Sequence, residues 1–160
     1  MIGEELRELY QEIILDHGRH PRNFRQPPEA NRQAHGHNPL CGDTLLVFLT
    51  LDADGHITDA AFKGKGCAIS MASASLMTEA LRGKSIAEAK ALFARFHGLC
   101  TGQPLEGANS PLAAAVEEEE LERLTPLSGV RAFPVRVKCA TLAWHTMLAA
   151  LSGQQEVSTE

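Results

Sequence analysis

The sequence lacks any apolar run long enough to cross a membrane, because its longest, Leu45 to Leu51, falls far short of the roughly 20 residues required. It also lacks a block of lysine and arginine, and 15 basic against 20 acidic side chains give a net charge of −5. A protein that binds nucleic acid through its phosphates needs a basic face. We therefore expect neither nucleic acid nor a membrane as a partner.

Other signatures are missing as well. The N-terminus, Met1 to Arg7, is charged and amphipathic, so we expect no secretory signal and a cytoplasmic location. The motifs His-Glu-x-x-His and His-x-Glu with Pro-Cys-x-x-Cys do not occur, which argues against a zinc hydrolase. The four cysteines then favour metal or redox chemistry over a disulfide framework.

Hydrophobic periodicity predicts an α+β domain with a small antiparallel sheet. Apolar residues at helical spacing follow Leu6 to Ile14. The alternating run Thr44 to Leu51, a turn, and His56 to Lys63 then predict a β-hairpin. A short strand near Gln33 to Gly36 would complete a three-stranded antiparallel sheet. With 160 residues and 44% apolar content, the chain is long enough to form one domain with its own core.

The second half of the sequence predicts helices. Ala68 to Leu81 is rich in small residues, and Ser85 to Glu88 forms a capping box for a helix that ends near Phe96. Pro111 to Leu124 predicts a further helix after a loop. An apolar stripe predicts a last helix that begins at or just after Cys139, followed by a polar tail.

Three cysteines have sequence contexts typical of a metal site. Cys41 stands two residues before Asp43, whereas Cys67 and Cys139 are each expected to begin a helix, where a thiol's pKa is lowered. If they converge, three thiolates and one carboxylate make a tetrahedral set for Zn²⁺. Basic residues that flank two of the cysteines would offset the excess negative charge: Lys63, Lys65, Arg136 and Lys138.

Less specific interpretations remain open. A free cysteine is usually a small buried apolar residue, and this is the interpretation we favour for Cys100. His35 and His37 precede Cys41 closely and are candidate ligands, but surface or hydrogen-bonded histidines are commoner. A purely structural zinc module is also possible, although it leaves Asp43 and the basic flanks without a role.

At these residues the chain resembles the IscU/SufU/NifU N-terminal family of iron–sulfur cluster assembly proteins. Tyr10 to His17 and Pro21 to Phe24 are similar to the family's N-terminal signature, and three further segments are similar to its cysteine motifs: His37 to Asp43, Gly64 to Ser70 and Val137 to Ala143. The resemblance implies an α+β fold, with the helices packed on one face of the sheet and the site at one exposed end. It also implies four ligands for zinc or a cluster: Cys41, Asp43, Cys67 and Cys139.

Within the family, the chain is most similar to the SufU branch. Lys138 stands where IscU-type scaffolds carry histidine, the chaperone-binding segment of those scaffolds is reduced to Phe133 to Lys138, and residues 98–126 resemble the SufU insertion. We expect a single domain over residues 1–151 and a flexible tail over 152–160. The resemblance implies a sulfur carrier that works with a cysteine desulfurase of the SufS type, rather than a stand-alone enzyme.

The implied function is a zinc-dependent transfer of persulfide sulfur to the cluster-building complex or to apo-protein recipients. Cys41 is the predicted sulfur acceptor, because Gly42 and the preceding loop give it mobility, and Arg136 is a candidate contact for the sulfur or the partner. The alternative is a scaffold that assembles and transfers a transient [2Fe–2S] cluster on the same four ligands.

Overall fold

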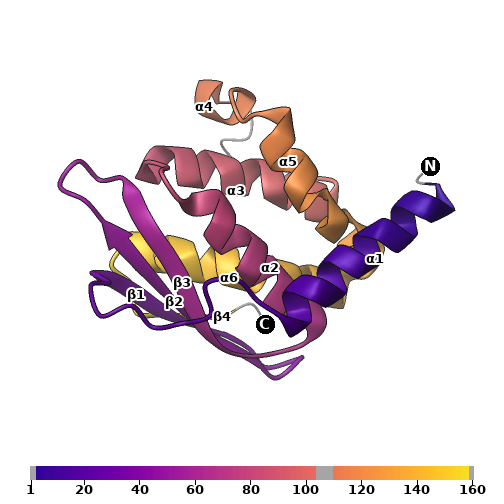
Figure 1. Ribbon diagram of the computed structural model, residues 1–160, viewed down its shortest axis with the longest axis horizontal. Coiled ribbons are helices and arrows are strands. Elements are labelled where there is room, and N and C mark those ends of the chain that lie inside the picture. The colour runs from indigo at the N-terminus through magenta and orange to yellow at the C-terminus, as the bar shows by residue number, and fades with distance from the viewer. Residues whose placement is uncertain (1–2, 104–109, 159–160) are drawn as a thin grey trace.

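The computed structural model describes residues 3–103 and 110–158, in which helices cover one face of a four-stranded sheet (Figure 1). In chain order the elements are α1 (Glu4–Arg19), β1 (Arg32–Asn38), β2 (Asp43–Leu51), β3 (Ile57–Lys65), α2 (Ala68–Leu81), α3 (Ile86–Thr101), α4 (Pro111–Ala114), α5 (Glu118–Leu124), the 3₁₀ helix η1 (Thr125–Ala132), α6 (Pro134–Leu151) and β4 (Glu156–Ser158). None of the helices described combines the length and apolarity that crossing a membrane requires.

The predicted hairpin is confirmed as β2 and β3, which pair antiparallel. Its turn is held by Asp52, whose Oδ1 accepts hydrogen bonds from the backbone N–H groups of Asp54 and His56. Gly55 takes a φ of 82° in this turn, a conformation that costs glycine little. The local turn chemistry therefore agrees with the alternating pattern of the strands.

The prediction of a three-stranded antiparallel sheet is wrong in its strand count. The strand order is β3-β2-β1-β4, and β4 pairs parallel with β1, so the sheet is mixed. Residues 156–158 lie in the tail that we expected to be flexible. A strand of three residues gives almost no periodicity, and its pairing with β1 is made across more than 100 residues of chain, so the sequence pattern carries little trace of it.

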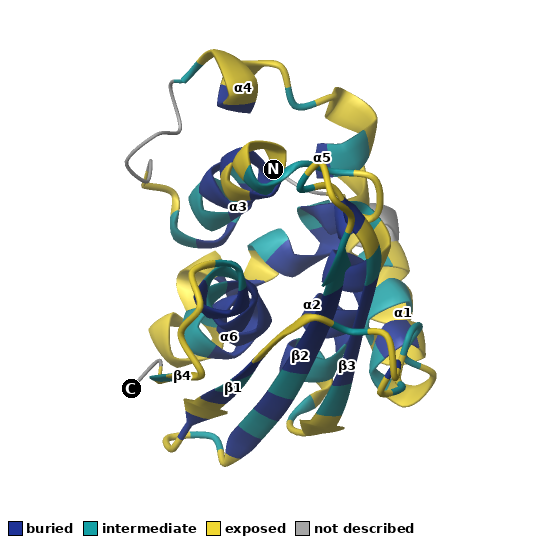
Figure 2. Cartoon of the chain, turned by 90° about the vertical axis from the view of Figure 1, so that its left-hand side faces the viewer, coloured by how far each residue is buried: buried dark blue, intermediate teal, exposed yellow. Residues whose placement is uncertain are grey.

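The helix layer is built from α2 and α6, which pack on the same face of the sheet, and α3 lies outside α6 (Figure 2). Small residues let α2 and α6 approach closely. Ser73 of α2 donates a hydrogen bond to the Ala140 carbonyl oxygen and accepts one from Trp144 Nε1. The indole of Trp144 also stacks on Phe96 with ring centroids 4.6 Å apart, which ties α3 to the same core.

Three helix predictions differ from the structure, and the first concerns α3, which continues to Thr101 and does not end near Phe96. The last helix, α6, begins at Pro134 rather than at Cys139, because proline at the first helical position loses no hydrogen bond. Arg136 and Lys138 therefore lie on the first turns of this helix. The single helix predicted over residues 111–124 is two short helices, α4 and α5, whose break falls at residues 115–117. Part of the loop predicted before it, residues 104–109, lies outside the described residues.

Candidate metal centre

Cys41 lies in the tight turn between β1 and β2. Asn38, the last residue of β1, holds this turn, because its backbone oxygen accepts from Cys41 N and its side-chain Oδ1 accepts from Leu40 N. Gly42 has a φ of 71°, which a residue with a side chain rarely adopts, so the chain reverses immediately after the thiol. The result is a half-buried cysteine on an exposed loop.

Asp43 and Cys67 are joined by the backbone. Asp43 opens β2 with a fully buried side chain, and its Oδ1 accepts a 2.9 Å hydrogen bond from the backbone N–H of Cys67. Cys67 is the N-cap of α2, as the sequence predicted, and its Sγ accepts from Ser70 N at 3.5 Å. Gly66 is required here, because a Cβ would lie 2.2 Å from Ser70 Oγ and 2.7 Å from Asp43 Oδ1.

Cys139 enters the site from the second turn of α6. Its Sγ is 3.0 Å from Sγ of Cys41 and accepts a weak hydrogen bond from Asn38 Nδ2 at 3.8 Å. Burial raises the pKa of the Cys139 thiol, and the hydrogen bond with Cys41 and the negative charges of Cys67 and Asp43 raise it further. Negative charges this close together disfavour deprotonation of the thiols. The cysteines of such a site are therefore thiolates only when a cation is bound.

The structure brings Cys41, Asp43 and Cys139 together, with one ligand atom from each lying within 4.8 Å of the other two. Asp43 Oδ2 is buried and has no hydrogen-bond partner. A buried carboxylate oxygen without a donor is costly unless a cation satisfies it. Thiolate sulfur together with carboxylate oxygen suits Zn²⁺, so the residues present fit a zinc ion.

The fourth predicted ligand, Cys67, is not part of that group of three. Its negative charge nevertheless contributes to the raised pKa of Cys139, so Cys67 borders the group. Its backbone fixes Asp43, as described above. The structure thus places Cys67 beside the site, and its role as a ligand stays a prediction.

Arg136 lies on the first turn of α6 at the rim of the site. Its side chain is exposed, and its pKa is raised by a hydrogen bond with Cys139 and by the negative charges of Cys67 and Cys41. Three large apolar side chains are also exposed on the two segments that carry Cys41 and Cys139, with relative exposures of 61% for Leu40, 61% for Phe133 and 52% for Val135. This rim therefore joins one cation to an apolar surface.

The remaining candidates lie elsewhere. Cys100 is buried in α3, where burial raises the pKa of its thiol to about 12, as expected of a packing residue. His35 and His37 lie on β1 beside β4, and neither belongs to the group of three. Sequence reasoning missed Asn38, although an asparagine before proline is a turn signal and stands three residues before Cys41.

Comparisons of the sequence with family models and with known proteins indicate the same family. Residues 9–103 match the NifU-like N terminal domain. The chain is 37% identical to the zinc-dependent sulfurtransferase SufU of Bacillus subtilis, over 87% of this chain and 86% of that protein. It is 38% identical to the iron–sulfur cluster assembly scaffold protein IscU of Streptococcus pyogenes, over 94% of this chain and 87% of that protein.

Solved structures agree. A crystal structure of a putative iron–sulfur cluster assembly scaffold protein for the SUF system, from Fervidobacterium islandicum, superposes with a TM-score of 0.76 at 29% identity, covering 93% of this chain and 99% of that one. The chain therefore belongs to the IscU/SufU/NifU N-terminal family of iron–sulfur cluster assembly proteins, on its SufU branch.

Proposed function

We propose that this protein accepts persulfide sulfur from a cysteine desulfurase in a zinc-dependent manner and relays it to the cluster-building machinery. The observation that carries the proposal is the buried, unpartnered Oδ2 of Asp43 beside the paired thiols of Cys41 and Cys139. The printed name of the Bacillus subtilis relative, a zinc-dependent sulfurtransferase, supports the same reading.

Zinc would be held by Cys41, Asp43, Cys67 and Cys139, and when bound it supplies a positive charge that keeps the thiols deprotonated. Cys41 is the proposed acceptor among them. It is half-buried on a turn that ends in Gly42, whereas Cys139 is buried in α6 and Cys67 caps α2. A residue on a turn moves toward a partner more readily than one on a packed helix.

The transfer itself is a thiol–disulfide-type exchange. The Cys41 thiolate attacks the outer sulfur of the desulfurase persulfide, a new sulfur–sulfur bond forms at Cys41, and the desulfurase cysteine leaves as a thiolate. Arg136 is the proposed contact for the incoming sulfur or for the partner, because its exposed guanidinium lies beside the thiols. The apolar rim around Leu40 and Phe133 supplies surface for the partner.

The test is desulfurase turnover. With a SufS-type desulfurase and free cysteine, the protein should raise alanine production well above the rate of the enzyme alone. Cys41→Ala should abolish this stimulation and Asp43→Ala should reduce it, whereas Cys100→Ala, which alters a buried residue of α3, should leave it intact. A Cys41→Ala protein that stimulates fully would contradict the assignment of the acceptor.

The second candidate function is a scaffold for a [2Fe–2S] cluster on the same residues, which the name of the Streptococcus pyogenes relative favours. It predicts unchanged desulfurase turnover and a stable brown chromophore once iron and sulfide are supplied. In either role the proposed recipients are the cluster-building complex or apo-proteins, and the cytoplasmic location stays a prediction.

A further inference from the structure

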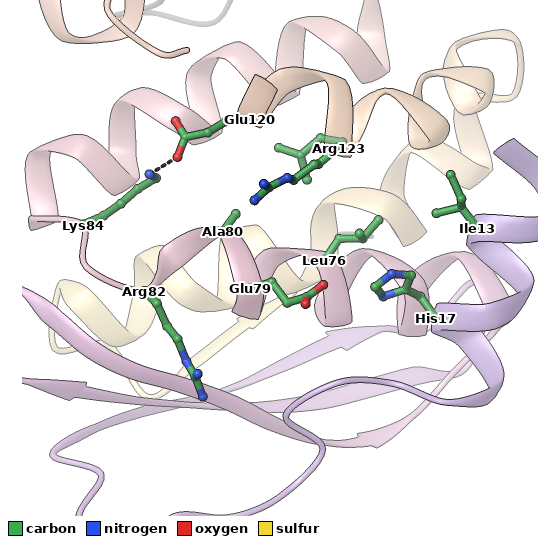
Figure 3. Close-up of a pocket in the computed structure, with 10 residues that line it drawn as sticks. Ile13, His17, Leu76, Glu79, Ala80, Arg82, Lys84, Glu120 and Arg123 are labelled. Atoms are coloured by element: carbon green, nitrogen blue, oxygen red, sulfur yellow. Dashed lines mark hydrogen bonds and ion pairs between the residues drawn. The ribbon is translucent and has the colours of Figure 1, made fainter. Parts of the chain in front are cut away.

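A cavity of about 470 Å³ lies at the far end of α2 from the candidate metal centre (Figure 3). It is formed by α1, α2 and α5, and its apolar lining comes from Ile13, Leu76, Ala80 and Leu124. Because α2 has 14 residues, its ends are about 20 Å apart at a rise of about 1.5 Å per residue. Small-molecule sites commonly enclose about 300–1,000 Å³, so this cavity has the size of one.

Most charged groups around the cavity already have partners. Lys84 forms an ion pair with Glu120 across the opening. The guanidinium of Arg82 points away from the cavity in Figure 3 and pairs with Asp59. His17 shares a hydrogen bond with Ser75, and burial lowers the pKa of its imidazole, so it is neutral at pH 7. Because these groups are paired or neutral, none of them is available as a charged partner for a ligand.

Two groups remain available. Arg123 on α5 and Glu79 on α2 line the cavity, and neither makes a hydrogen bond or an ion pair with any residue that the structure describes. Figure 3 shows the Arg123 guanidinium extending over Ala80, and the Glu79 carboxylate turned toward His17 on the same side of α2. One cation, contributed by α5, and one anion, contributed by α2, thus border an apolar floor.

We propose that this cavity binds a small zwitterion with an apolar body, namely a free α-amino acid that carries a branched or aromatic side chain. The ligand's carboxylate accepts hydrogen bonds from Arg123, whose planar fork suits that group. Its ammonium group donates to Glu79, and its side chain packs on Ile13 and Ala80, the partly exposed apolar residues of the lining. This inference is independent of the sulfur-transfer function, and it gives α5 a role because that helix forms one wall of the site.

The experiment titrates the zinc-loaded, full-length protein with L-leucine while backbone amide shifts are followed by NMR. We expect saturable shifts at residues 76–84 and 120–124. Two analogues separate the charges, since 4-methylpentanoate lacks the ammonium group and 3-methylbutylamine lacks the carboxylate. Each should bind about fivefold more weakly than leucine, because exposed ion pairs contribute modestly.

Two variants assign the contacts. Arg123→Gln should bind leucine as weakly as the wild-type protein binds 3-methylbutylamine. Glu79→Gln should bind leucine as weakly as the wild-type protein binds 4-methylpentanoate. Neither substitution should change the melting temperature. Arg32→Gln, an exposed arginine on β1, is the matched control and should bind normally. The proposal is overturned if neither leucine nor phenylalanine shifts these amides, or if both analogues bind as tightly as leucine. It is also overturned if both variants lose stability and bind leucine normally, because that result would indicate an Arg123–Glu79 ion pair and no ligand site.

Discussion

Sγ of Cys41 and Sγ of Cys139 lie 3.0 Å apart, although 98 residues separate the two cysteines in the chain. The contact joins the β1–β2 turn to α6, the two parts of the fold that frame the candidate metal centre. Cys41 makes this contact from a turn, and Cys139 makes it from a packed helix.

The amide of Asn38 should strengthen zinc binding. Its Nδ2–H donates to Cys139 Sγ, and its Oδ1 holds Leu40 N in the turn that presents Cys41. Removing a group that orients a ligand typically costs 10–100-fold in metal affinity. We expect Asn38→Ala to weaken zinc binding by about tenfold or more, measured by competition with a chromophoric chelator. Cys100→Ala should bind zinc normally, and a loss below about twofold in Asn38→Ala would show that the amide does not support the site.

Zinc should support the fold locally rather than create it. The core of α2, α3 and α6 against the sheet, centred on Trp144, does not include the candidate ligands apart from Cys139. Chelation should therefore lower the melting temperature and leave the helical circular dichroism largely intact, unlike a zinc finger that unfolds without metal. Complete loss of helicity after chelation would contradict this view.

The zinc-free protein should form a disulfide between Cys41 and Cys139. Their sulfurs need to approach by only about 1 Å to reach bonding distance, and Cys41 lies on a turn that allows it. With diamide as oxidant, both thiols lose their hydrogens to the diazene, and peptide mapping should find this one linkage. The zinc-loaded protein should resist oxidation, and Cys100 should stay reduced because it is buried. A predominant disulfide to Cys67 would show that the site is arranged differently.

Stability should fall in mild acid through two histidines, the buried His17 and the half-buried His145. Burial lowers the pKa of His17, and burial together with His97 lowers the pKa of His145, both from an ordinary value of 6.5. Below that value the unfolded state binds more protons than the folded state, so the stability present above pH 6.5 is lost as the pH falls toward the folded-state pKa values.

The corresponding measurement is urea unfolding at pH 7.5 and 5.5. The protein is used without zinc, because protons would otherwise compete with zinc for the thiolates. His145→Gln should show a smaller loss of free energy of unfolding than the wild type. His56→Gln, which alters a half-exposed histidine near the hairpin turn, should behave as the wild type does. An equal loss in all three proteins would exclude His145 as a contributor.

Sequence patterns predicted the parts of this molecule that depend on local signals. The β2–β3 hairpin follows from alternation and a glycine turn, and the start of α2 at Cys67 follows from a change of period. The start of α6 was predicted too late, at or just after Cys139, although proline at the first helical position was a usable signal. The pairing of β4 with β1 depends on contacts between distant parts of the chain.

The same contrast holds for the candidate site. Each cysteine was found from its own context, but the approach of Cys41 to Cys139 results from packing α6 against the sheet. The isolation of Asp43 Oδ2 likewise results from burial in the folded chain. The contribution of Asn38 depends on a hydrogen bond to a residue 101 positions away. No local pattern encodes such a contact.

The most direct test of sulfur transfer locates the sulfur itself. The zinc-loaded protein is incubated with a SufS-type desulfurase and cysteine, separated from the enzyme, alkylated and mapped by mass spectrometry. We expect one additional sulfur atom on the peptide that contains Cys41, and none on that peptide in Cys41→Ala. An unmodified Cys41 peptide together with a persulfide on Cys67 or Cys139, or no persulfide at all from an active desulfurase, would contradict the account.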